Sequence, residues 1–153
     1  MYSSQQSNVV SAYGAFFQGW AWDHFATLTF ARKQSQANCL RLYNAFIQSL
    51  GRTTLGRVGW VRVGEIRSSD CGSPEIPLHF HALLKYKNVP PPEAVAALWK
   101  AKAGDAQVEA YRAGGGGAVY VAKMLPYEDT NYDMGGLEYF PRSEGSPIRG
   151  SSN

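Results

Sequence analysis

The stretch Leu78-His-Phe-His-Ala-Leu-Leu-Lys-Tyr86 decides the fold more than any other part of the sequence. Read as a β-strand, it sends His79 and His81 to one face and Phe80 to the other, because successive side chains of a strand point to opposite faces. Phe80 then lies in the core. The preceding stretch, Val58-Gly-Trp-Val-Arg-Val-Gly-Glu-Ile66, is also typical of a strand, and we expect the two strands to pair as neighbours.

Outward from these two strands, hydrophobic periodicity predicts the remaining elements. Alternating β-branched and aromatic residues indicate a strand at 24–30. Apolar residues in steps of three and four indicate a helix at 36–50, ended by Gly51. The other expected elements are a helix at 93–102 opened by prolines, a strand at 105–111, a helix at 118–125 ended by Pro126, and an edge strand at 137–140.

This order of elements suits an α+β fold. We expect a central antiparallel sheet of about four to five strands with helices packed on it, of the ferredoxin or RRM-like kind. A single domain should span residues 1–153, with its core at 24–125 and a loop-rich segment at 126–153. Aromatic residues near the N-terminus favour a cover over one end of the core, with a base-stacking role as the alternative: Phe16, Phe17, Trp20 and Trp22.

Composition sets only broad limits on function. Of 153 residues, 44% are hydrophobic and 18% charged, which is ordinary for a globular protein, and the net charge of +3 permits a nucleic-acid partner without indicating one. Cys39 and Cys71 are expected to be free thiols in a reducing compartment. No signal peptide is visible, and no apolar stretch approaches the ~20 residues that span a bilayer, so we expect a cytoplasmic protein.

Glu65 makes the two histidines a candidate metal site. It is a charged residue near the end of an otherwise apolar strand, and pairing of the two strands would let it project beside His79 and His81. Two imidazoles and one carboxylate suit a divalent ion such as Mn²⁺ or Mg²⁺ at a phosphate-handling site. No cysteine joins them, unlike in a structural zinc site. The alternative is a solvated glutamate paired with a neighbouring arginine.

Tyr120 and Lys123 form a second candidate pair. Residues three apart on a helix share a face, so the phenol and the ammonium can point at one place. A phenol has a pKa of about 10 and needs help to act as a nucleophile at neutral pH, which a nearby cation partly supplies. A buried tyrosine beside a solvated lysine is the alternative. Gly114–Gly117, ahead of this helix, is either a phosphate-binding approach or a flexible joint.

Three short motifs together resemble those of HUH endonucleases. They are Phe25-Ala-Thr-Leu-Thr-Phe30, Pro77-Leu-His-Phe-His-Ala-Leu-Leu84 and Tyr120-Val-Ala-Lys123, in that order. Within the superfamily, the resemblance is to single-tyrosine rolling-circle replication initiators (Rep proteins) of plasmids and phages. It covers residues 24–125, and Glu65 matches the family's acidic metal ligand. Each motif is short, but three in the right order on the right elements are specific together.

The resemblance implies a mechanism as well as the HUH nuclease fold. A divalent metal, Mn²⁺ or Mg²⁺, held by Glu65, His79 and His81 would polarise the scissile phosphate. Tyr120 would attack the phosphorus to give a 5′-phosphotyrosine and a free 3′-hydroxyl, while Lys123 steadies the phosphate or the phenolate. Reversal of the attack would rejoin the strand without ATP. The expected partner is single-stranded DNA at an origin or hairpin, bound by a monomeric domain that a plasmid, phage or other mobile element encodes.

The chain departs from some members of the superfamily. Its helix motif holds one tyrosine, and Tyr127 lies beyond Pro126, so a two-tyrosine mechanism is not expected. The tyrosine follows the histidines, unlike in conjugative relaxases, and no Walker-type Gly-Lys-Ser/Thr is present. Three other functions remain open: an HUH transposase with the same site, an RRM-like module that binds single strands without cutting them, and a hydrolase in which water attacks.

Basic residues near the strands are candidates for contacts with the DNA backbone, although an ordinary surface role fits each of them equally. They are Arg32, Lys33, Arg62, Arg67, Lys85 and Lys87. His24, at the start of the first expected strand, has three open orientations: toward solvent, toward DNA or toward the metal.

Overall fold

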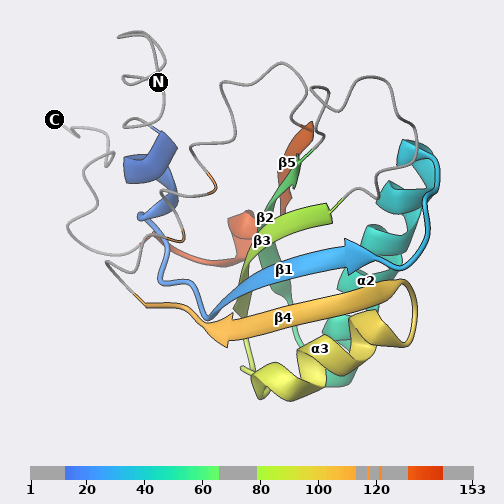
Figure 1. Ribbon diagram of the computed structural model, residues 1–153. Helices are drawn as coiled ribbons and strands as arrows, with labels where there is room; N and C mark the ends of the chain where they lie inside the picture. The colour runs from blue at the N-terminus through green and yellow to red at the C-terminus, as the bar shows by residue number, and fades with distance from the viewer. Residues whose placement is uncertain (1–12, 66–78, 113–116, 118–120, 122–130, 143–153) are drawn as a thin grey trace, which may run out of the picture.

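A five-stranded antiparallel sheet with helices packed on it forms the framework of the protein (Figure 1). The computed structural model describes residues 13–65, 79–112, 117, 121 and 131–142. The α+β class expected from the sequence is therefore confirmed.

The strands are β1 (His24–Phe30), β2 (Val58–Glu65), β3 (His79–Tyr86), β4 (Gly104–Ala110) and β5 (Asn131–Gly135). Among the described residues, the two long helices are α2 (Gln36–Thr54) and α3 (Pro92–Lys100), and a 3₁₀ turn, η2 (Leu137–Tyr139), follows later. In space the strands lie in the order β4-β1-β3-β2-β5. The first four have the βαββαβ connectivity of ferredoxin-like folds, and β5 extends the sheet beyond β2.

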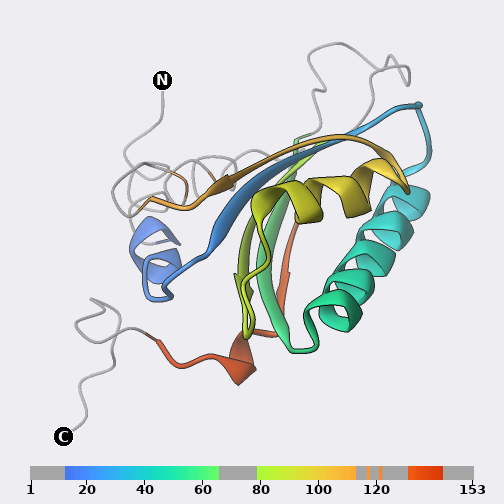
Figure 2. The same ribbon diagram turned by 90° about the horizontal axis from the view of Figure 1, so that it is seen from below.

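Helices α2 and α3 cover one face of the sheet (Figure 2). Phe80 is 1% exposed on this face, which confirms that it points into the core. The rings of Phe30 and Trp99 meet edge to face with centroids 5.1 Å apart, and those of Tyr43 and Phe80 do so at 5.6 Å. Such edge-to-face pairs add to the stabilisation that burial provides. Cys39 is buried here as a free thiol, whereas Cys71 lies outside the described residues.

The N-terminal aromatic residues cover part of the opposite face. Phe17, Trp20 and Trp22 are buried there with side chains from β2 and β3, and residues 13–17 are helical. The indole N–H of Trp20 donates to the carbonyl oxygen of Phe140 at 3.2 Å. The predicted cover is thus confirmed, and the C-terminal segment helps to hold it.

Helix α2 runs past Gly51, so the predicted end of this helix was wrong. It continues to Thr54, and Leu55 terminates it in the left-handed conformation with φ 54°. The amide of Asn88 donates to the carbonyl oxygens of Thr54 and Leu55 at 2.9 and 3.3 Å. A residue 34 positions away therefore satisfies the carbonyls at the helix end, and Gly51 is an ordinary helical position.

The edge strand predicted at 137–140 was also wrong. Residues Leu137–Tyr139 form the 3₁₀ turn, and the strand at this edge of the sheet is β5, which pairs with β2. Gly136, with φ 69°, ends β5. The next residue, Leu137, is buried on the sheet face opposite α2 and α3. The remaining predicted bounds agree within two residues wherever they are described. Of the helix predicted at 118–125, the structure describes Val121, which is helical and buried on the sheet face opposite α2 and α3.

Candidate functional site

The two histidines of β3 lie side by side on the face opposite α2 and α3. Their ring centroids are 5.2 Å apart and their planes are nearly perpendicular, at 88°. His81 is 6% exposed, and His79 is half-buried. The alternation of the strand fixes this arrangement, because Phe80 between them takes the opposite, helix-covered face. The expected pair of imidazoles on one face is therefore present.

The register of β2 on β3 brings Glu65 to the same place in the sheet. The Cα of Glu65 is paired with that of His79, and Val63 is paired with His81. Residues directly opposite each other in an antiparallel pair share a face. The expected pairing of the two strands is confirmed, and the backbone of Glu65 has the position that a third ligand needs. The side chain of Glu65 lies outside the described residues.

Strand β1 supplies the immediate surroundings of His81. The hydroxyl of Thr27 is 3.3 Å from Nδ1 of His81, to which it is paired across the two strands. The ring of Phe25 stacks on the imidazole, with centroids 6.0 Å apart and planes 7° from parallel. These contacts fix the orientation of the ring at one nitrogen and on one face. A group bound by His81 at Nε2 would therefore meet an imidazole that is already oriented.

This donor set is the kind that holds a divalent metal through nitrogen and oxygen atoms. Among the side chains that the structure describes, no three histidine, cysteine, aspartate or glutamate residues form a metal-binding group. Two described imidazoles and one glutamate backbone position are the part of the predicted ligand set that the structure brings together.

Tyr120 and Lys123 lie outside the described residues, whereas Gly117 and Val121 are described. A Cβ built on Gly117 would lie 3.1 Å from Cε1 of Tyr111 and 3.6 Å from Cδ1 of Phe25. Gly117 thus packs beside the ring that stacks on His81. The described residue three positions before Tyr120 is therefore close to the histidine face of the sheet.

The predicted DNA contacts fall into different environments. Arg32 and Lys33 are exposed just after β1, and Arg32 lines a groove of about 570 Å³ with Lys100 and Lys102. Lys85 and Lys87 lie at the other end of β3, and Arg67 lies outside the described residues.

The structure contradicts the prediction that Arg62 contacts DNA. It is 3% exposed on the helix-covered face, where its guanidinium lies over the rings of Tyr43 and Phe80 at 5.1 and 5.2 Å. Alternation along β2 explains this placement, because Val61 and Val63 take the histidine face and Arg62 takes the other one. A phosphate cannot reach a side chain so deeply buried.

His24 also lies away from the histidine pair. It is 2% exposed, and its Nδ1 is 3.0 Å from the hydroxyl of Tyr86. The imidazole of His24 therefore lies in the core, and the three orientations considered above, toward solvent, DNA or the metal, were all wrong. Sequence reasoning missed Thr27 and Phe25 as partners of His81, although alternation along the strand at 24–30 places both on one face.

No family model, no curated protein and no solved structure matches this chain. Within the described part of the chain, no helix has both the length and the apolar character needed to cross a membrane.

Proposed function

We propose that this protein is a metal-dependent endonuclease and strand transferase acting on single-stranded DNA, of the HUH Rep type. The observation that carries the proposal is the pair His79 and His81, with ring centroids 5.2 Å apart on the sheet face opposite α2 and α3, and with the backbone of Glu65 opposite His79. Hydrophobic packing does not explain two imidazoles and a carboxylate position together, whereas a divalent metal site for phosphate chemistry uses such a donor set.

His79, His81 and Glu65 would hold Mn²⁺ or Mg²⁺. When bound, the metal supplies charge neutralisation at the scissile phosphate. Two side chains of β1 orient the imidazole of His81 at this end of the site. Thr27 engages Nδ1 of His81, which leaves Nε2 as the nitrogen that would bind the metal, and Phe25 holds the plane of the ring.

Tyr120 is the proposed nucleophile. Its phenol oxygen forms a bond to phosphorus, the bond from phosphorus to the 3′-oxygen breaks, and the phenol proton passes overall to that oxygen. The product is a 5′-phosphotyrosine and a free 3′-hydroxyl, which suits priming of rolling-circle replication of a plasmid or phage. Lys123 stabilises the phosphate or phenolate charge. The packing of Gly117 beside Phe25 supports this assignment, because it brings the described start of the segment near the histidines.

Two rival functions share the chemistry of the site. A transposase of the same superfamily differs in its DNA substrate, and a hydrolase differs in using water as the nucleophile.

A third alternative, a binding module without catalysis, predicts exposed aromatic rings on the middle strands. Among the described residues, the exposed large hydrophobic side chains are Tyr13, Leu55, Val89 and Tyr139, none of them on β1 or β3. This favours the nuclease over the binding module.

The test mixes the full chain with a Mn²⁺ salt and single-stranded oligonucleotides from the element that encodes it, followed by denaturing electrophoresis. We expect a protein band that carries DNA covalently and disappears in Tyr120→Phe. Tyr127→Phe is the matched control and should keep the band. His81→Ala should lose metal binding and cleavage together.

Each other outcome selects a rival. Cleavage without an adduct favours attack by water. Cleavage by Tyr120→Phe at the wild-type rate rules out this nucleophile. Binding of an origin strand without cleavage in any metal favours the binding module. Transfer of element ends, with no nick at an origin, favours the transposase.

A further inference from the structure

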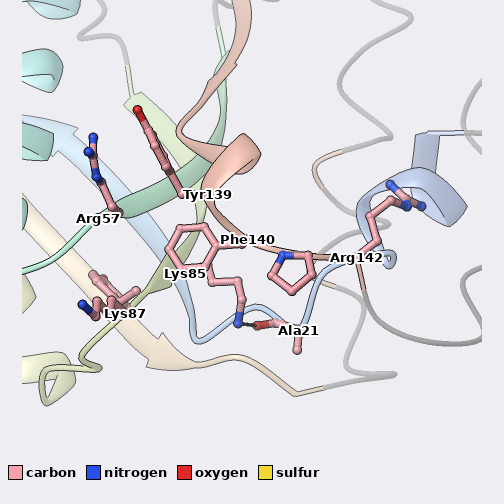
Figure 3. Close-up of a pocket in the computed structure, with 9 residues that line it drawn as sticks. Ala21, Arg57, Lys85, Lys87, Tyr139, Phe140 and Arg142 are labelled. Carbon is pink, nitrogen blue, oxygen red and sulfur yellow. Dashed lines mark hydrogen bonds between the residues drawn. The ribbon is translucent and has the colours of Figure 1, made fainter.

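A groove of about 710 Å³ lies at the far end of β3 from His79 (Figure 3). Its walls come from separate segments: Lys85 and Lys87 at the end of β3, Arg57 just before β2, and Tyr139 and Phe140 after β5. Six residues of strand separate His79 from Lys85, which corresponds to about 20 Å. The groove is therefore distinct from the histidine site.

The charge of this groove is of one sign. Four cations line it, Arg57, Lys85, Lys87 and Arg142, and no aspartate or glutamate is among its described lining residues. The guanidinium of Arg142 packs over the rings of Phe16 and Trp20, at 4.9 and 4.5 Å from their centroids. The Lys85 ammonium donates to the carbonyl oxygen of Ala21 at 2.7 Å, so this lysine is held in place across the groove (Figure 3). Arg57 and Lys87 are exposed. A ligand with several negative charges fits such a wall.

Aromatic rings stand among these cations. Tyr139 is 51% exposed, and the guanidinium of Arg57 lies 4.0 Å from its ring centroid. The ammonium of Lys85 lies 5.6 Å from the ring centroid of Phe140. Cations that follow a backbone, combined with rings on which bases stack, are the features that bind single strands without sequence preference. An acidic peptide or a lipid headgroup would use the cations but has no base to stack on Tyr139.

We propose that this groove binds single-stranded nucleic acid, with phosphates on Arg57, Lys85 and Lys87 and a base stacked on Tyr139. The site is independent of the metal and of strand cleavage. Its role is to hold a strand at a second place, about 20 Å from the histidine pair along the sheet.

The experiment measures fluorescence anisotropy of a labelled oligothymidylate of about 20 nucleotides with the full chain in the presence of EDTA. The chelator removes any contribution of a bound metal. The double variant Arg57→Ala/Lys87→Ala should weaken binding at least about tenfold and flatten the slope of log affinity against log salt by about 1.4, two phosphate contacts at ~0.7 each. Tyr139→Ala should weaken binding about 5- to 100-fold, and Tyr139→Phe should retain it.

The matched control is Arg41→Ala/Arg52→Ala, which removes two exposed charges from α2 and should bind as the wild type does. Wild-type affinity in the groove variants would overturn the proposal. So would equal binding of a duplex of the same length with no effect of Tyr139→Ala, which indicates a general polyanion site. Recruitment of the wild type by anionic phospholipid vesicles, without binding of the oligonucleotide, would assign the groove to a membrane surface.

The proposed groove and the proposed nuclease can be tested independently of each other. Tyr120→Phe and His81→Ala should leave oligothymidylate binding in EDTA unchanged. A protein that binds through the groove but forms no covalent adduct keeps this proposal and loses the proposed nuclease.

Discussion

Thr27 on β1 lies directly across from His81 on β3, with its hydroxyl 3.3 Å from Nδ1 of the imidazole. This contact links the first strand to the candidate metal site, because the nitrogen that Thr27 engages determines which nitrogen faces a ligand. The orientation of His81 therefore depends on a residue that binds no metal itself.

Thr27→Val should weaken Mn²⁺ binding by about 10- to 100-fold, since it keeps the shape of the side chain and removes the hydroxyl. Thr27→Ser should restore most of the affinity. Isothermal titration calorimetry with Mn²⁺ measures the change, and thermal unfolding checks that both variants are folded. Equal metal affinity in all three proteins would show that the hydrogen bond does not orient His81.

Arg62 is expected to stabilise the fold rather than to bind DNA. Burial lowers the pKa of its guanidinium, which packs over Tyr43 and Phe80. Arg62→Ala should reduce the free energy of unfolding by about 2–4 kcal/mol, because a cavity replaces the side chain. Arg62→Met should cost less, since it fills much of the volume, removes a buried charge and leaves the exposed Asp133 hydrated.

Urea unfolding of these variants tests the role of Arg62. The control is Arg57→Ala at an exposed position, which should change the free energy of unfolding by no more than about 0.5 kcal/mol. If Met costs as much as Ala at position 62, then the charge itself is required. If Arg62→Met lowers the affinity for single-stranded DNA while stability is kept, the original assignment regains support.

His24 should make the protein less stable in mild acid. Burial lowers its pKa below the ordinary value of 6.5, while Asp23 and Glu93 act weakly in the other direction. Below about pH 6.5 the unfolded chain therefore binds a proton at His24 more readily than the folded chain does. The free energy of unfolding is at its full value above about pH 6.5 and falls as the pH drops below it. The neutral imidazole also keeps its contact with the hydroxyl of Tyr86.

Urea unfolding between about pH 5 and pH 7.5 measures this effect. His24→Gln can still contact Tyr86 and does not titrate, so its stability should depend less steeply on pH than that of the wild type. Identical slopes in the two proteins would show that another group causes the acid sensitivity.

Two glycines should respond to alanine with opposite signs. A Cβ at Gly104 would collide with backbone atoms of Thr29 and Ala31, which cannot move without disturbing the pairing of β1 with β4. Gly104→Ala should therefore cost about 1–3 kcal/mol. Gly51 lies within α2, where the nearest atom to a new Cβ is 3.4 Å away, so Gly51→Ala should stabilise by about 0.5–1 kcal/mol. Paired thermal and urea unfolding curves test both, and a destabilised Gly51→Ala would contradict the view of Gly51 as an ordinary helical position.

The fold was largely predictable because its signals are local. Alternation along 24–30, 58–66 and 78–86 was sufficient to locate the three central strands. The errors arose where distant residues decide the outcome. Gly51 does not end α2, because Asn88 caps the carbonyls further along, and this contact cannot be read from the helix itself.

The site was predictable in part for the same reason. A spacing of two placed His79 and His81 on one face, but Thr27 becomes a partner of His81 only through the register of β1 on β3. Arg62 was misjudged because a charged residue on a strand suggests exposure until the helix that covers it is known. The groove joins Arg57, Lys87 and Tyr139 from three separate segments, and no local pattern connects them.

The hydrogen bond from Trp20 to the carbonyl oxygen of Phe140 spans 120 residues of sequence. A ribosome adds about 5–20 residues per second, so Trp20 is made roughly 6–24 s before its partner exists. During that interval the N-terminal aromatic cluster cannot complete its packing. The nascent chain therefore presents an apolar segment to chaperones, or to a neighbouring copy, until the C-terminal turn has been synthesised.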